Sequence, residues 1–153
     1  MSLLVGIIMG SLTDEPLVVE TQKVLDDMGI EYESKVISAH RRPDALSEYA
    51  RAASGRGIEL LIGVAGAAAA LPGALASLSD LPVIGVPAPS SDLKGIDALL
   101  AIAQMPPGIP VATVAIGSMG ARNAGYLAAR ILGIKHESIR ESYGTYRAGL
   151  AAG

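Results

Sequence analysis

Few residues in this chain of 153 have side chains that could do chemistry, and the clearest group is "SAHR", residues 38–41. His40 could carry a proton, because an unperturbed imidazole gains and loses its proton near neutral pH. Arg41 beside it could grip two oxygens of a phosphate with its planar guanidinium. The residues alone leave a second interpretation open, in which His40 only hydrogen-bonds a neighbouring loop. The pattern suggests acid–base chemistry on a small phosphorylated molecule.

Two further segments could help to bind such a molecule. In "GSLTDE" (10–15), the hydroxyl of Ser11 and free backbone N–H groups at a helix start would suit an anion. Asp14 would repel a phosphate, so it suits a pair of ribose hydroxyls, although it could equally cap the helix. The segment "AGAAAALPG" (65–73) has no acid, base or nucleophile. It offers backbone N–H groups and room for a small carboxylate, CO₂ or a flat ring, or it serves tight helix–sheet packing.

Other polar residues are expected at the surface. His136, the second of two histidines, lies in a polar segment and is expected to be solvated. Asp92, Lys94 and Asp97 are expected in an exposed loop and helix start. With no cysteine, the chain has no disulfide, thiolate metal site or thiol nucleophile.

The composition predicts one domain over residues 1–153 with much hidden surface. Half of the residues are apolar and 18% are charged, which excludes disorder and suggests a sheet core, subunit contacts or both. The net charge of −3 argues against a nucleic-acid or anionic-membrane binder. Residues 60–79 carry no charge and match a membrane span in length, but their alanine, glycine and "LPG" favour a strand followed by a helix. No signal peptide is recognised, so a cytoplasmic protein is expected.

The elements that must position these groups alternate along the chain. Strands are predicted at 3–10, 32–37, 58–64, 82–87 and 110–116, and helices at 16–29, 42–54, 95–105, 120–133 and from 136 onward. This alternation predicts a three-layer α/β/α sandwich with a flavodoxin-like parallel sheet of about five strands. The loops after the strands, including the three segments above, should meet at one edge of the sheet, where such folds bind ligands.

The motifs taken together resemble a known family. The segments "GIIMGSLTDE", "VISAHRRPD", "AGAAAALPG", "LPVIGVP", "GIDALLAIAQMPPGIPVATVAIG" and "GARNAGYLAARILG" fall in the order and spacing of the PurE family of purine biosynthesis. The resemblance covers roughly residues 4–133. It implies a mutase that moves a carboxyl group from N5 to C4 of an aminoimidazole ribonucleotide, because Arg41 and the "LPG" ending are similar to the mutase branch.

The resemblance also implies roles for single residues. His40 would be the general acid and base, Ser11, Ser38 and Arg41 would hold the phosphate, and Asp14 the ribose hydroxyls. The apolar loop would shield CO₂ from water, and the substrate-binding residues of this loop would be Ala65, Gly66, Ala67 and Leu71. No cofactor or metal is implied. The expected assembly is a homo-octamer whose last helix, about 136–151, packs on a neighbouring subunit.

Five departures from the mutase pattern leave alternatives open. Ala70 stands where a histidine usually precedes "LPG", Ala67 replaces a glycine, Glu15 a tryptophan, and Ala98 and Ala101 replace serines. One alternative is a carboxylase or decarboxylase of another heteroaromatic ribonucleotide. Another is a non-catalytic relative that binds a ribonucleotide. An FMN carrier is a third, but the chain has no Trp or Phe to stack on a flavin.

Overall fold

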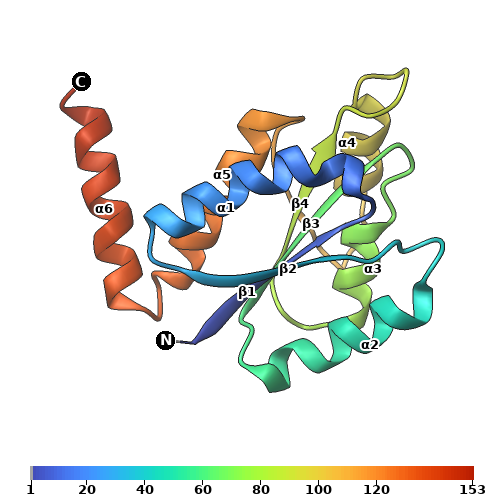
Figure 1. Ribbon diagram of the computed structural model, residues 1–153, viewed down its shortest axis with the longest axis horizontal. Coiled ribbons are helices and arrows are strands. Elements are labelled where there is room, and N and C mark those ends of the chain that lie inside the picture. Colours follow the sequence, from blue (N-terminus) through green and yellow to red (C-terminus); the bar gives the residue numbers. More distant parts are fainter. Residues whose placement is uncertain (1) are drawn as a thin grey trace.

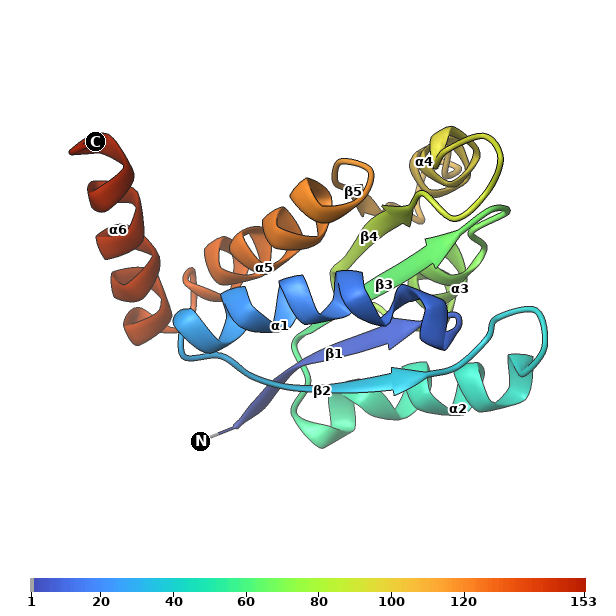
Figure 2. The ribbon, with the colours of Figure 1, turned by 45° about the horizontal axis from the view of Figure 1, so that its top comes forward.

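The computed structural model describes residues 2–153. Its centre is a parallel sheet of five strands, which Figures 1 and 2 show with helices packed around it. The strands are β1 (Leu3–Met9), β2 (Glu31–Val36), β3 (Leu60–Gly66), β4 (Val83–Ala88) and β5 (Ala112–Thr113). Their order across the sheet is β2-β1-β3-β4-β5, with every pair parallel. This is the flavodoxin-like order, so the predicted fold class is confirmed.

The central strands are apolar along their whole length because helices cover both faces of the sheet. Alternate side chains of β1 point to opposite faces, so Ile7 joins one buried cluster and Ile8 the other. Helices α1 (Glu15–Asp27) and α5 (Ser118–Leu132) cover the face of Ile7. The other face carries three helices: α2 (Pro43–Ala53), α3 (Leu71–Leu78) and α4 (Ile96–Ala103).

The uncharged stretch 60–79 divides between β3 and α3, as the "LPG" at its middle predicts. Pro72 lies in the first turn of α3, where a missing N–H costs no hydrogen bond. Within residues 2–153, no helix combines the length and apolarity needed to cross a membrane.

The fifth strand is much shorter than predicted. The sequence suggests a strand over 110–116, but only Ala112 and Thr113 pair with β4, opposite Ile84 and Gly85. Pro110 cannot donate a backbone hydrogen bond, and it follows a turn at Gly108. Beyond Thr113, the N–H groups of Val114 and Gly117 still donate hydrogen bonds to the β4 carbonyls of Gly85 and Pro87, without forming a regular ladder. The run of β-branched residues therefore overestimates the length of this edge strand.

Helix α6 (Glu137–Ala151) projects from the body and packs mainly on α5 (Figure 1). Ile139 is its buried residue, and Tyr143 and Tyr146 gather around Tyr126 of α5. The Tyr126 and Tyr146 rings stack with their centroids 4.4 Å apart. Leu150, near the end of the same helix, is exposed.

His136, expected to be solvated, instead joins an ion-pair cluster at the turn between α5 and α6. Its Nε2 lies 2.8 Å from Oε2 of Glu59, which precedes β3, and Lys135 contacts the other carboxylate oxygen. Glu59 is 77 residues away in the sequence, so no local pattern could reveal this partner. The hydrogen bond from Lys135, helped by His136, lowers the pKa of Glu59.

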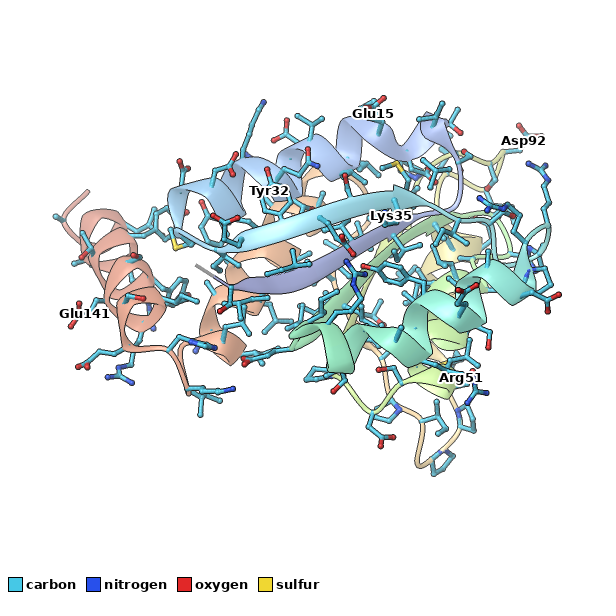
Figure 3. The ribbon with its side chains drawn as sticks, turned by 60° about the horizontal axis from the view of Figure 1, so that its bottom comes forward. Glu15, Tyr32, Lys35, Arg51, Asp92 and Glu141 are labelled. Carbon is cyan, nitrogen blue, oxygen red and sulfur yellow. The ribbon has the colours of Figure 1, made fainter. Side chains whose placement is uncertain are left out.

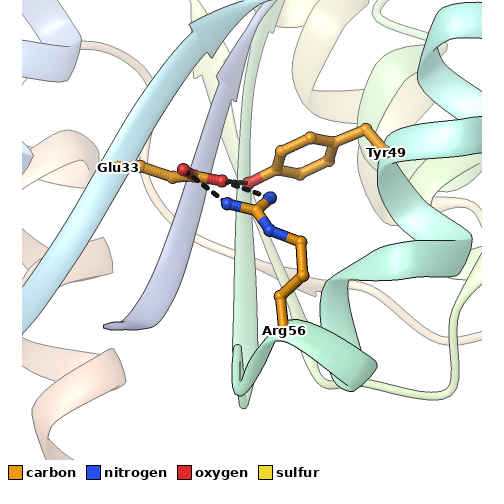
Figure 4. Close-up of polar contacts among 3 residues, drawn as sticks. All are labelled: Glu33, Tyr49 and Arg56. Carbon is orange, nitrogen blue, oxygen red and sulfur yellow. Dashed lines mark hydrogen bonds and ion pairs between the residues drawn. The ribbon is translucent and has the colours of Figure 1, made fainter. Parts of the chain in front are cut away.

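The edge strand β2 is tied to α2 by a polar cluster of three residues (Figure 4). Arg56 donates two hydrogen bonds of 2.8 Å to the carboxylate of Glu33, and the Tyr49 hydroxyl donates a third of 2.8 Å. The hydrogen bonds from Arg56 lower the pKa of Glu33, while burial raises that of Tyr49. The cluster braces the two elements that flank the segment "SAHR". The surroundings of this edge are exposed, with Lys35 on β2 and Arg51 on α2 at the surface (Figure 3).

Tyr49 reaches Glu33 only because β1 has no side chain at Gly6. A Cβ atom built there would lie 2.4 Å from the Tyr49 hydroxyl oxygen and 3.0 Å from Leu61 Cδ2. We expect Gly6→Ala to displace Tyr49 and to lower the free energy of unfolding by about 1–3 kcal/mol, measured by urea denaturation. Gly144→Ala on exposed α6 is the matched control and should gain up to about 1 kcal/mol. Equal effects of the two substitutions would contradict this account.

Candidate active site

One cavity of about 330 Å³ opens at the carboxyl ends of the strands. It lies over β1 and β3, where the chain turns from one half of the sheet to the other, which is the usual ligand position in this fold. Its walls come from the loops after β1, β2, β3 and β4. All nine predicted site residues line it: Ser11, Asp14, Ser38, His40, Arg41, Ala65, Gly66, Ala67 and Leu71. The structure thus brings the three predicted segments together.

The loop after β1 supplies hydroxyls and a buried carboxylate. Ser11 and Thr13 are joined by a hydrogen bond between their hydroxyls, and both line the cavity. Asp14 is the N-cap residue of α1, yet its side chain makes no capping hydrogen bond and is only 6% exposed. Helix capping therefore does not explain why an aspartate is buried at this position. Its carboxylate lines the cavity instead.

Burial raises the pKa of the Asp14 carboxyl, and a weaker backbone contact with Ser11 opposes the shift. The folded protein therefore holds this proton more tightly than the unfolded chain does. Below the unfolded pKa of 3.8 the carboxyl is protonated in both the folded and the unfolded state, so it does not change the free energy of unfolding. As the pH rises from there through the folded pKa, the free energy of unfolding falls, and it stays lower at higher pH. Asp14 is thus a carboxylate that the fold keeps at a cost in stability near neutral pH.

We expect Asp14→Asn to raise the free energy of unfolding at neutral pH, because it removes a buried charge while keeping the side-chain shape. The gain should shrink as the pH is lowered below the folded pKa of Asp14, because the wild-type carboxyl then takes up its proton. Denaturant unfolding at a series of pH values measures this. Asp44→Asn at the exposed start of α2 is the control and should lose a few tenths of a kcal/mol, about the size of one helix-dipole interaction. A destabilised Asp14→Asn would contradict the account.

The loop after β2 presents the histidine and the arginine. Ser38 accepts a hydrogen bond of 3.2 Å from the backbone N–H of Arg41, and its carbonyl accepts one of 2.9 Å from Arg42 N–H. The loop is therefore folded back on itself before Pro43 starts α2. His40 lines the cavity and is exposed, with no hydrogen-bond partner for its ring among residues 2–153. The alternative interpretation, a histidine that holds a neighbouring loop, therefore has no contact to support it.

The loop after β3 forms an apolar wall with an unusual backbone. Ala67 and Ala69 have φ angles of 53° and 41°, in the left-handed region that costs a residue with a Cβ about 1 kcal/mol or more. The Ala69 N–H closes the turn on the carbonyl of Gly66 at 3.0 Å. The side chains facing the cavity here are methyl groups and Leu71. This wall can exclude water but cannot transfer a proton.

Sequence reasoning missed Ser90, on the loop after β4, as a residue of the cavity. Gly10, Thr13, Ala39, Ala69 and Ala70 also line it without having been predicted as site residues. The only signal for Ser90 was its place after a strand, because a single serine in a loop forms no motif. Of the cluster expected to be exposed, Asp97 instead accepts a hydrogen bond from Ser91.

The arrangement suits a phosphorylated heterocycle. Arg41, His40 and several hydroxyl groups line the same cavity as the apolar wall formed by the loop after β3. Within residues 2–153, no group of three or more His, Cys, Asp or Glu side chains could hold a metal ion.

Comparisons with known proteins agree with one another. The sequence model of a family described as AIR carboxylase matches residues 4–152. An N5-carboxyaminoimidazole ribonucleotide mutase of Pyrococcus abyssi is 59% identical over 143 residues, 94% of this chain and 81% of that protein. A protein of the same name from Pseudomonas aeruginosa is 55% identical over 148 residues, 97% of this chain and 91% of that one.

A crystal structure of PurE from Treponema denticola has a similar fold. It superposes with a TM-score of 0.89 at 30% sequence identity and covers 97% of this chain and 92% of that chain. The similarity therefore extends through the sheet, the loops around the cavity and the C-terminal helix.

Proposed function

The chain belongs to the AIR carboxylase family, and from that membership we propose that it is an N5-carboxyaminoimidazole ribonucleotide mutase, an isomerase of purine biosynthesis. The observation that carries the proposal is the 59% identity to a mutase over 94% of the chain. The cavity supports it, because His40 and Arg41 share its wall with Asp14 and the apolar loop.

The proposed reaction moves a carboxyl group in two steps. His40 first donates a proton to N5 as the bond between N5 and the carboxyl carbon breaks, which releases CO₂ and leaves aminoimidazole ribonucleotide. The C4 atom then attacks CO₂ to form the new carbon–carbon bond, and neutral His40 removes the C4 proton. The proton is returned and the enzyme ends as it began, so the reaction needs no external acid or base. No cofactor or metal takes part in this scheme.

The other residues bind and shield the substrate. The guanidinium of Arg41, with the hydroxyls of Ser11 and Ser38, would hold the phosphate. Asp14 would accept hydrogen bonds from the ribose hydroxyls, which a buried carboxylate needs in order to offset its desolvation. The wall of Ala65, Gly66, Ala67 and Leu71 would keep CO₂ from water between the two steps.

We further propose that residues 1–153 form one domain that works in the cytoplasm as a homo-octamer, with α6 packed on a neighbouring subunit. Large apolar side chains exposed on this chain support an assembly of several copies. They include Ile96, Leu100, Met119, Ile134 and Leu150, which are 52–84% exposed. Sedimentation analysis of the purified protein would test the octamer, and a monomer would contradict it.

Complementation tests the proposed function in a cell. A bacterial purine auxotroph that lacks the mutase should grow without added purine when it expresses this chain. The His40→Asn variant, expressed at the same level, should not restore growth. Failure of the wild-type chain, despite normal expression, would contradict the proposal and favour the carboxylase or non-catalytic alternatives.

A further inference from the structure

Ser90 differs from the other polar residues of the cavity in the loop from which it comes. Six other polar side chains line it, and all six come from the loops after β1 and β2. In residues 2–153, Ser90 is the one polar side chain that reaches the cavity from the β3 and β4 side. It therefore stands across the cavity from the residues proposed to hold the phosphate and ribose.

The hydroxyl of Ser90 lies directly over the backbone of the apolar wall. A Cβ atom built on Gly66 would lie 1.8 Å from Ser90 Oγ and 3.2 Å from Ser90 Cβ. A residue larger than glycine at this position would thus displace the hydroxyl. Ser90 has no hydrogen-bond partner for its side chain within residues 2–153, so the hydroxyl is free to bind a ligand.

The loop that carries Ser90 is braced next to it. The Ser91 hydroxyl donates a hydrogen bond of 2.9 Å to Asp97 at the start of α4 and accepts one of 3.2 Å from the Leu93 N–H. The Ser91 carbonyl accepts a further bond of 2.9 Å from the Lys94 N–H. Pro89 precedes Ser90 and restricts the backbone on the other side. The hydroxyl is therefore held over Gly66 without having to order a flexible loop.

We propose that Ser90 binds the migrating carboxyl group, donating its hydroxyl proton as a hydrogen bond to a carboxylate oxygen and then to CO₂. This inference rests on the proposed function and adds a residue to it. With the phosphate at Arg41, the heterocycle extends toward the wall, where the side chains other than Ser90 are methyl groups and Leu71. Ala70 lines the same wall, so no imidazole shares this task there. No bond to Ser90 forms or breaks during the reaction.

The test compares two ligands that differ only in the carboxyl group. Calorimetry would measure the dissociation constants of aminoimidazole ribonucleotide and of its C4-carboxylated product. We expect Ser90→Ala to weaken binding of the carboxylated product about tenfold, the effect of one hydrogen bond to a charged group. Binding of aminoimidazole ribonucleotide should stay within about twofold, because that ligand lacks the group. Ser77→Ala, whose hydroxyl bonds only the Ala74 carbonyl of its own helix, is the matched control and should change neither.

Turnover gives a second readout that a structural role would not produce. When Ser90→Ala converts N5-carboxyaminoimidazole ribonucleotide, a larger share should escape as aminoimidazole ribonucleotide and CO₂, measured against a reaction without enzyme. Equal losses of affinity for both ligands, or no loss for either, would overturn the inference while the wild type still converts its substrate. A wild-type protein that neither binds nor converts these ligands would overturn the proposed function itself, and this inference with it.

Discussion

Replacing His40 with asparagine lowers kcat for N5-carboxyaminoimidazole ribonucleotide by about 10²- to 10⁴-fold, the usual contribution of a positioned general acid and base. Asparagine keeps much of the shape of histidine but cannot take up or release the proton. Neither of the two proton transfers at N5 and C4 then has a carrier, because the opposite wall has only apolar side chains and Ser90. The affinity for aminoimidazole ribonucleotide should change little, since His40 is assigned to the chemistry and not to the phosphate.

The second histidine provides the matched control. His136→Asn changes the same residue type, but His136 pairs with Glu59 near the amino end of β3, at the opposite end of the strand from the cavity. It should leave kcat unchanged and lower the free energy of unfolding by up to about 1 kcal/mol. Steady-state kinetics of both variants measure the contrast. A His40→Asn variant with wild-type kcat would remove His40 from the mechanism.

Replacing Arg41 with alanine raises the dissociation constant of aminoimidazole ribonucleotide by about 10- to 100-fold. A charge-assisted bidentate contact with a phosphate is among the stronger hydrogen-bonded interactions, and Arg41 is the one arginine or lysine that lines the cavity within residues 2–153. Arg41→Lys should recover part of the loss, because lysine restores the charge but not the planar fork. Calorimetry at two salt concentrations should show a weaker salt dependence for Arg41→Ala than for the wild type.

Arg42 is the adjacent control for this prediction. It carries the same charge one residue along, but its side chain does not line the cavity. Arg42→Ala should therefore bind aminoimidazole ribonucleotide with nearly wild-type affinity. If both variants lose affinity to the same extent, the loss reflects the overall charge of the protein, and the assignment of the phosphate to Arg41 is wrong.

Much of the site could be predicted from the sequence because parallel sheets gather their loops at one edge. The buried strands β1 and β3 are continuous apolar runs, and a glycine or a short polar segment marks where each one ends. Once the strands are placed, Ser11, His40 and Gly66 must lie near one another, although the chain separates them by up to 55 residues. The sheet topology therefore predicts a proximity that no local motif could predict.

Features that depend on distant partners could not be predicted. The ion pair of His136 needs Glu59, and the burial of Asp14 without a capping bond depends on the loops around it. Ser90 is an ordinary loop serine until Gly66 is placed beneath its hydroxyl. The left-handed backbone of Ala67 and Ala69 is likewise invisible in a run of alanines, where intrinsic preference favours a right-handed helix.

The most direct test of the central claim follows the carboxyl carbon itself. N5-carboxyaminoimidazole ribonucleotide labelled with ¹³C in its carboxyl group is incubated with the purified protein in unlabelled bicarbonate, and the products are followed by NMR. The proposed mutase should deliver the label to the C4 carboxyl with little dilution, because the released CO₂ stays in the cavity. An unlabelled C4 carboxyl, or no C4-carboxylated product at all, would contradict the account.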